Sequence, residues 1–170
     1  MSGKVILIAR TSPLQLDLNI TTRSLSTEDI AALGQLYFSA YDKGQAEKSL
    51  EAATESIAAS FDGKFGTLLT DASQVALDED GNIIAGILVV ERSNHEGTPE
   101  APFLIELVTD RDHRRQGLAE RLVLLSGEKL FNAGYQEVAV RVKESNSAAL
   151  ALYLSLDFRR WDAEQAEQED

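Results

Sequence analysis

The chain has 170 residues, with 16 basic and 28 acidic side chains, a net charge of −12 and no cysteine. Its length favours a single domain, and a hydrophobic share of 44% is typical of a folded globular protein. The lack of cysteine excludes disulfide scaffolds and thiol chemistry, and two histidines leave little material for a metal site, so no metal is expected. The negative charge argues against nucleic-acid and anionic-membrane partners. We therefore expect a cytoplasmic protein without a targeting or membrane-spanning segment.

The N-terminal part predicts two strands followed by two helices. A short buried strand is expected at 4–10, and period-two alternation predicts a second strand around 16–25. Ser26 followed by acidic residues is typical of a helix start, because the hydroxyl and the carboxylates meet free backbone amides. The pattern then predicts helices over about 26–42 and 45–61.

Strands dominate the middle of the chain. Two are predicted at about 67–77 and 82–91, joined by a hairpin turn at a glycine, and a third is predicted at 103–109. The remaining predicted elements are a helix, a strand, a helix and a short last segment, at 117–132, 137–142, 147–156 and 158–161. This order predicts an α/β fold with one mixed sheet in a single domain over 1–161. The acidic residues 162–170 are expected to fray as a tail.

A basic loop joins a predicted strand to a predicted helix at 109–119. The free amides and the dipole of a helix N-terminus attract anions. Gly117 lets a phosphate approach the backbone, and Arg114 and Arg115 add positive charge to an acidic protein. Taken alone, this spacing fits a phosphate site and an ordinary basic loop equally well. The chain lacks the glycine-rich motifs of Rossmann and P-loop nucleotide sites.

A second group of residues belongs to the predicted helix 147–156. Asn146 precedes this helix, and Ala149, Leu152 and Tyr153 fall on one of its faces. Taken alone, Tyr153 fits a packed tyrosine and Asn146 fits a helix cap. The order and separation of the two groups carry more information than either group by itself.

Together the two groups resemble the GNAT superfamily of acyl-CoA-dependent N-acetyltransferases. Residues 114–119, Arg-Arg-Gln-Gly-Leu-Ala, match that family's Arg/Gln-x-x-Gly-x-Gly/Ala pyrophosphate loop. The family's Asn-x-x-Ala-x-x-Leu-Tyr-x-x-x-Gly-Phe helix is matched from Asn146 to Phe158, with Asp157 in place of the glycine. Arg111 stands where the family often has proline. The order of elements fits over most of the chain, although a convincing last strand is missing.

The resemblance implies a GNAT-like fold, in which a central twisted mixed sheet is flanked by about four helices, here with an extra N-terminal strand at 4–10. This strand or a partner subunit would cover the C-terminal edge of the sheet, since an open edge invites pairing. A monomer and a homodimer both remain open. In this family two central strands splay apart, and acetyl-CoA, the co-substrate, lies in the resulting cleft.

The resemblance also assigns residues to the cofactor. The backbone of Leu107, Val108 and Thr109 would pair with the pantetheine arm like an added strand, and Asn146 would contact the arm from the other side. The remaining contacts would come from the pyrophosphate loop, which comprises Arg114, Arg115, Gln116, Gly117, Leu118 and Ala119.

The implied reaction is direct attack of a primary amine on the thioester of acetyl-CoA in a ternary complex. By resemblance Tyr153 is the general acid, and an ordinary tyrosine pKa near 10 allows it to protonate a thiolate. Glu106 is a candidate base, because burial in an apolar strand would raise its pKa. An outward-facing position for Glu106 and a water chain as the base are alternatives. His113, in the loop near the phosphates, fits a structural or exposed position better.

Two other functions stay open. The chain could be a GNAT-fold module that binds acyl-CoA for regulation without turnover, or an acidic interaction protein without a cofactor. The acceptor is an unidentified amine, either a small molecule or a protein amine, and we expect the first two helices and the loop 92–102 to select it. The net charge is compatible with a cationic acceptor such as a polyamine, an aminoglycoside or a protein amine.

Overall fold

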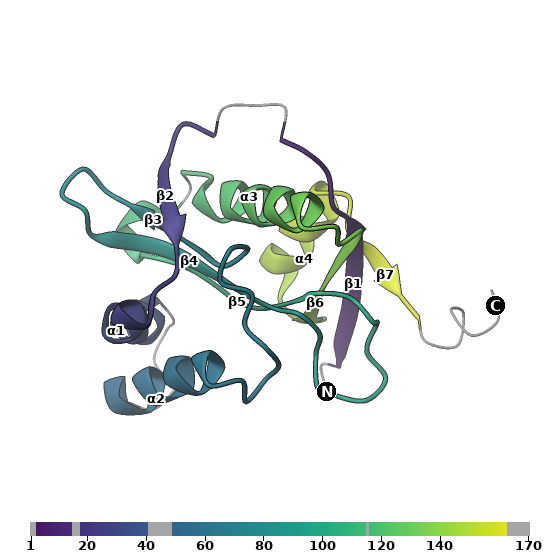
Figure 1. Ribbon diagram of the computed structural model, residues 1–170, viewed down its shortest axis with the longest axis horizontal. Coiled ribbons are helices and arrows are strands. Elements are labelled where there is room, and N and C mark those ends of the chain that lie inside the picture. Colours follow the sequence, from purple (N-terminus) through teal and green to yellow (C-terminus); the bar gives the residue numbers. More distant parts are fainter. Residues whose placement is uncertain (1–2, 15–17, 41–48, 115, 163–170) are drawn as a thin grey trace.

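The computed structural model describes residues 3–14, 18–40, 49–114 and 116–162, which form one seven-stranded sheet with helices on both faces (Figure 1). The strands are β1 (Lys4–Arg10), β2 (Thr21–Ser24), β3 (Gln74–Leu77), β4 (Ile83–Val90), β5 (Phe103–Thr109), β6 (Glu137–Lys143) and β7 (Arg159–Trp161). The α-helices are α1 (Ile30–Ala40), α2 (Leu50–Phe61), α3 (Leu118–Asn132) and α4 (Ser147–Ser155), with short 3-10 helices η1 (Thr27–Asp29) and η2 (Arg111–His113). None of the helices described here has the length and apolar character needed to cross a membrane.

The sheet has the order β2-β3-β4-β5-β6-β1-β7. Neighbouring strands are antiparallel except for β5 and β6, which run parallel. The N-terminal strand β1 pairs with β6 along its whole length and with β7 on its other side. The extra strand predicted at 4–10 therefore covers the edge of β6, and the predicted mixed sheet with four helices is confirmed.

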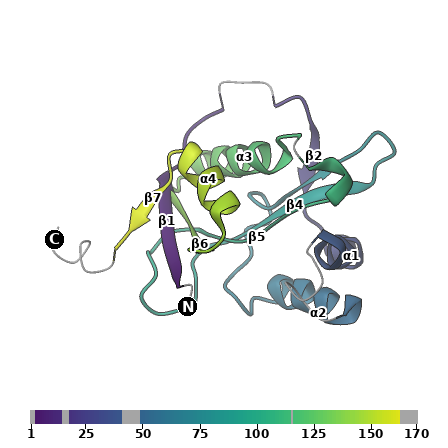
Figure 2. The ribbon, with the colours of Figure 1, turned by 180° about the vertical axis from the view of Figure 1, so that it is seen from behind.

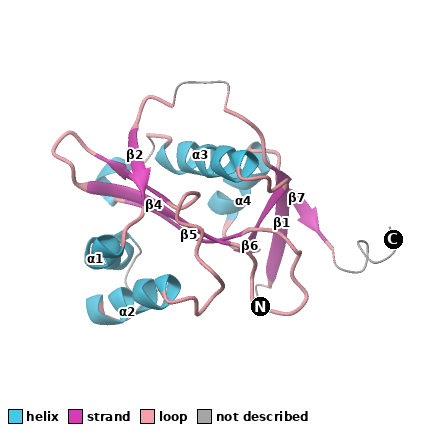
Figure 3. Cartoon of the chain, viewed as in Figure 1, coloured by secondary structure: helices cyan, strands magenta, loops and turns pink. Residues whose placement is uncertain are grey.

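The four helices are divided between the two faces of the sheet (Figures 1 and 2). Helices α3 and α4 pack on one face, where a continuous cluster of buried residues includes Leu122, Val140 and Tyr153. Helices α1 and α2 lie on the other face, where Leu33 and Ile57 pack with residues of β3 and β4. In the described part of the chain, α1 and α2 lie beside β2 to β5, and no helix covers β6, β1 and β7 on that face (Figure 3).

The predicted helix start at Ser26 is confirmed, and the short 3-10 helix η1 precedes α1 there. The Ser26 side chain accepts a hydrogen bond from the Glu28 amide, and the Asp29 carboxylate accepts one from the Ser26 amide at 2.9 Å. The two residues therefore form a capping box, because each side chain accepts a hydrogen bond from a backbone amide that has no partner within the helix. The chain enters α1 through η1. The predicted end of the first helix and the predicted start of the second lie outside the described residues.

Two predicted strands are wrong in length. The structure has β3 only at the end of the predicted 67–77, because a turn precedes it in which the Ser73 amide donates to the Leu69 carbonyl. Within the predicted 16–25, β2 begins only after Asn19, whose φ of 55° interrupts the extended backbone. Period-two alternation cannot detect either interruption, since both come from local backbone angles rather than from hydrophobicity.

Candidate functional site

The centre of the sheet opens between β5 and β6. These strands pair in parallel at only two positions, Phe103 with Ala139 and Leu104 with Val140, although both strands continue beyond them. The opening coincides with Ile105, which has no partner in the β4 ladder and forms a bulge. The splayed pair of strands that the resemblance implies is therefore present, with β5 and β6 as its two limbs.

The register of β5 places Glu106 and Leu107 on opposite faces of the sheet. Glu106 pairs with Leu88, whose hydrophobic cluster belongs to α1 and α2. Leu107 pairs with Ile87, whose cluster belongs to α3 and α4. Since directly paired residues share a face, Glu106 faces the α1/α2 side, while Leu107 faces the α3/α4 side. The alternation expected from the sequence holds at this point.

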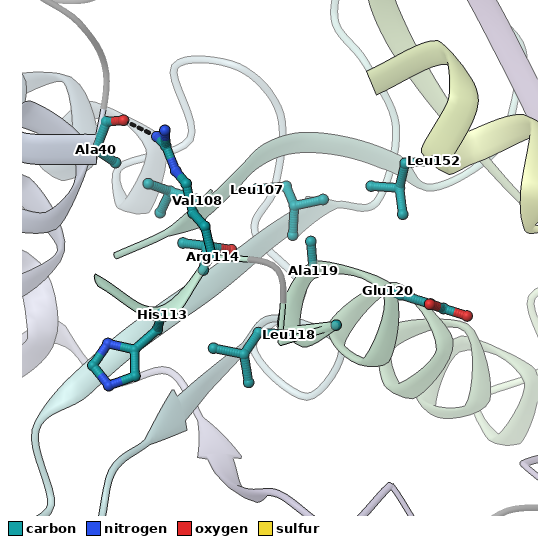
Figure 4. Close-up of a pocket in the computed structure, with 11 residues that line it drawn as sticks. Ala40, Leu107, Val108, His113, Arg114, Leu118, Ala119, Glu120 and Leu152 are labelled. Atoms are coloured by element: carbon teal, nitrogen blue, oxygen red, sulfur yellow. Dashed lines mark hydrogen bonds between the residues drawn. The ribbon is translucent and has the colours of Figure 1, made fainter. Parts of the chain in front are cut away.

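A cavity of about 390 Å³ lies at the N-terminus of α3 (Figure 4). Gly117 is the N-cap residue of α3 and has a φ of 74°, in the region that favours glycine. A Cβ at this position would have its nearest neighbour 4.0 Å away, so the glycine leaves room above the free amides of the helix. The cavity is lined by Ala40, Leu107, Val108, Thr109, His113, Arg114, Gly117, Leu118, Ala119, Glu120 and Leu152.

Two arginines of the basic loop reach back to α1. The Arg111 Nε donates to the Ser39 carbonyl at 2.9 Å, and the Arg114 guanidinium donates to the Ala40 carbonyl (Figure 4). These carbonyls lie in the last turn of α1, where the helix dipole favours cations. Each bond uses one of the five N–H donors of a guanidinium, so Arg114, which lines the cavity, could still bind an anion there together with the backbone amides of α3.

Three further residues of the loop differ in their surroundings. The Nδ1 atom of His113 lies 2.9 Å from the Asp110 carboxylate, which fits the structural position expected for His113. Gln116 is exposed, and Arg115 lies outside the described residues. In the part of the chain that the structure describes, no group of three or more histidine and carboxylate side chains could hold a metal ion.

A second, larger cavity of about 950 Å³ follows the opening between β5 and β6. Residues at the start of α4, on one face, contribute Ser145, Asn146 and Ala149. Elements on the other face, α1, α2 and the segments that flank β4, contribute Tyr37, Ser56, Ile57, Ser60, Phe65, Ser93 and His95. Because residues of both faces line it, the cavity connects the two sides of the sheet at the splay.

Tyr153 lies in the wall of this larger cavity, together with Glu106. Its ring is 4% exposed and packs edge-on against Phe158, with 5.2 Å between the ring centroids. Burial raises the pKa of Tyr153 well above its ordinary value, and the Glu106 carboxylate raises it further. Tyr153 therefore keeps its proton at neutral pH, and Glu106 is close enough to act on it electrostatically.

The structure brings Asn146 to the same cavity and gives it a capping role. Its side chain accepts a hydrogen bond from the Ala149 amide at 3.1 Å, as expected for an N-cap residue. After α4, Asp157 has a φ of 69°, which explains why the matching motif has glycine at this position. The departure affects an exposed turn and leaves the cavity wall unchanged.

Three basic residues that line the larger cavity, Lys4, Arg141 and Lys143, were not predicted as site residues. They alternate with buried valines in β1 and β6, so they look like ordinary outward positions. The sequence left open whether the first strand or a partner subunit covers the edge of the sheet, and only the observed register of β1 with β6 brings the two lysines together.

Comparison with known proteins places this site in a family. Residues 31–158 match the model of the acetyltransferase (GNAT) family. The chain is 33% identical over 89 residues to N-alpha-acetyltransferase 30 from Schizosaccharomyces pombe, a match that covers 52% of this chain and 58% of that protein. The chain thus spans little more than half the length of this relative.

Two solved structures share the fold. The ribosomal-protein-S18-alanine N-acetyltransferase from Escherichia coli has a TM-score of 0.64 at 24% identity, over 84% of this chain and 79% of that chain. The NatC complex bound to Gag peptide and CoA has a TM-score of 0.58 at 19% identity, over 81% of this chain and 82% of that chain. With the family match over most of its length, the splayed strands and the glycine at the start of α3, this chain belongs to the GNAT family of acetyltransferases.

Proposed function

We propose that this protein transfers the acetyl group of acetyl-CoA to a primary amine by direct attack in a ternary complex. The observation that carries the proposal is the cavity at the splay, which has Tyr153 and Glu106 in its wall and the N-terminus of α3 beside it. Family membership supports the class of reaction, and the CoA present in the NatC structure supports the cofactor.

The residues at the two cavities fit the parts of acetyl-CoA. Beyond the last pair with β6, the backbone of Leu107, Val108 and Thr109 has an unpaired edge that would pair with the pantetheine arm. The amides at the start of α3 would hold the pyrophosphate, since Gly117 has no side chain to cover them. Asn146 lines the opposite limb of the cavity.

Tyr153 and Glu106 would move the protons of the reaction. As the amine nitrogen bonds to the thioester carbon, the nitrogen gives up a proton, and Glu106 is placed to accept it directly or through water. As the bond between carbon and sulfur breaks, Tyr153 donates its proton to the sulfur. Burial raises the pKa of Tyr153, so its hydroxyl is protonated before the reaction and is available as the donor.

Calorimetric titration with acetyl-CoA tests the cofactor site. We expect micromolar binding by the wild type and binding at least about tenfold weaker by Gly117→Glu, since the carboxylate would stand over the amides that hold phosphate. Gly134→Glu is the matched control, because Gly134 also has positive φ, at 95°, and has open space after the far end of α3.

Each outcome decides the proposal. Wild-type binding that is lost only in Gly117→Glu supports it. Equal weakening in both variants would assign the loss to helix strain and added charge, and no wild-type binding would exclude the acetyl-CoA site. Tight binding without acetylation of any amine in a broad panel would favour a regulatory acyl-CoA-binding module instead.

A further inference from the structure

The two limbs of the splay carry opposite charges. Glu106 lies on the β5 limb, and Lys4, Arg141 and Lys143 line the same cavity on the side of β6 and β1. Arg141 is the first residue of β6 beyond its last pair with β5. Lys4 and Lys143 are directly opposite one another in the ladder between β1 and β6.

The basic side chains and Glu106 face the same side of the sheet. In β6, Val140 and Val142 are buried in the cluster of α3 and α4, so Arg141 and Lys143 project to the α1/α2 side. Glu106 faces that side as well. In the described part of the chain no helix lies over β6 and β1 on this side, and Ser93 and His95 from the segment after β4 also line the cavity.

The basic side chains lack the carboxylate partners that this acidic chain has in excess. The protein has 28 acidic and 16 basic residues, yet within the described residues none of the three basic side chains forms an ion pair. Like charges directly opposite one another destabilise a sheet. Lys4 and Lys143 form such a pair in the ladder between β1 and β6. Arg141 is oriented by the Phe103 ring, with 6.0 Å between its guanidinium carbon and the ring centroid. An anion bound between these groups would offset the repulsion between the two lysines.

The pyrophosphate of the cofactor would not be that anion. The N-terminus of α3, which we assign to the pyrophosphate, belongs to the opposite face and to the other cavity. An anion bound by Arg141 and the lysines would therefore belong to the second substrate, entering from the α1/α2 side.

We propose that the acceptor is a primary amine that also carries a carboxylate. Its carboxylate binds Arg141, Lys4 and Lys143, and its amino group lies toward Glu106 and Tyr153 on the other limb. This inference rests on the proposed acetyl transfer and specifies the acceptor more narrowly. It favours an acceptor with a carboxylate over the cationic acceptor with which the net charge is compatible. A free amino acid and the N-terminus of an acidic peptide share this chemistry.

Acetylation of matched amines tests the inference. Release of CoA would be measured with β-alanine against propylamine and β-alaninamide, and with the C-terminally amidated dipeptide Ala-Glu against amidated Ala-Gln and Ala-Lys, so that the Glu side chain is the only carboxylate in its set. We expect kcat/KM to be at least about tenfold higher for the carboxylate member of a set. A higher kcat/KM for β-alanine would identify the acceptor as a free amino acid, and a higher kcat/KM for the Ala-Glu peptide would identify it as a peptide.

Charge-removing variants locate the binding groups. Arg141→Gln and Lys143→Gln should raise the KM for the carboxylate acceptor and leave the Kd of acetyl-CoA unchanged. Arg10→Gln is the matched control, because Arg10 lies on the same face of β1 at the end remote from the cavity. Lys143 is exposed, so Lys143→Gln keeps the test valid if Arg141→Gln unfolds.

Three results would overturn the inference. Equal or better turnover of the neutral amines would refute it and leave the proposed acetyl transfer intact. Weaker acetyl-CoA binding by Lys143→Gln would show that the cations serve the cofactor. No acetyl-CoA binding and no turnover with any amine would remove both the inference and the proposed function.

Discussion

The two faces of the sheet are packed in different ways. The α3/α4 face has one continuous core that runs from β1 to β4 and includes the fully buried Leu122. The α1/α2 face has separate, smaller clusters, one of them around Leu33 and another around Leu36, and the larger cavity occupies the space beyond them. Continuous packing on one face thus supports the sheet, while the other face leaves a cavity beside its smaller clusters.

Tyr153 belongs to the core of the α3/α4 face and also lines the larger cavity, and its hydroxyl gives the largest expected effect. The change Tyr153→Phe should lower kcat by about 10²- to 10⁴-fold, because the departing sulfur loses its proton donor. Steady-state kinetics would measure kcat, and calorimetry should show an acetyl-CoA Kd within about threefold of wild type. Tyr135→Phe is the control, since Tyr135 packs on the same core without lining either cavity. Unchanged turnover in Tyr153→Phe would remove Tyr153 from catalysis.

Matched leucines test the difference in packing directly. Leu122→Ala removes a side chain that is 0% exposed in the continuous core, and Leu36→Ala removes one that is 6% exposed in a small cluster. We expect the free energy of unfolding to fall by about 4 kcal/mol for Leu122→Ala and by about 2 to 3 kcal/mol for Leu36→Ala. Urea titration followed by circular dichroism would measure both. Equal losses, or a larger loss at Leu36, would contradict the comparison.

The smallest expected effect is at Asp29, in the cap that leads to the α1/α2 face. The hydrogen bond from Arg23 lowers the pKa of Asp29, burial opposes this shift, and the Ser26 amide supports it. The folded-state pKa lies below the unfolded value of about 3.9, so the stability that ionised Asp29 contributes is present above that pH and is lost as the pH falls through the folded value.

Unfolding free energies of wild type and Asp29→Asn at pH 7, 4 and 3 would measure this loss. We expect the wild type to be the more stable protein at pH 7 and the difference to narrow at pH 3. A difference that does not change with pH would show that the charge of Asp29 contributes nothing to the cap.

Local patterns predicted the elements that are buried on at least one face. The strands β1 and β5 and the helix α3 match their predicted ranges closely, since their apolar residues recur at strand or helix spacing. The strand predicted at 67–77 was wrong because the turn before β3 is fixed by a backbone hydrogen bond rather than by composition. The bulge at Ile105 could not be predicted from the sequence either, since a bulge depends on how two strands pair.

For the candidate site, sequence motifs predicted individual residues but not which other side chains lie next to them in the fold. Gly117 was selected by its place before a predicted helix, and Tyr153 was selected by the resemblance of its helix to the family's motif. The approach of Glu106 to Tyr153 and the meeting of Lys4 with Lys143 depend on long-range pairing, which the order of elements alone does not determine. The Arg114 side chain was assigned to the phosphate loop, and its bond to the end of α1 likewise depends on tertiary contact.

The place of β1 between β6 and β7 also sets an order of events during synthesis. β1 leaves the ribosome before the other six strands of this sheet, and both of its partners lie near the other end of the described residues (Figure 1). The backbone of β1 therefore stays without its sheet partners until β6 and β7 have been translated. Contacts between such distant segments also form slowly. The β6 limb of the splay is translated late as well. A nascent chain without β6 therefore lacks the splay, and β1 is among the last of the seven described strands to be paired.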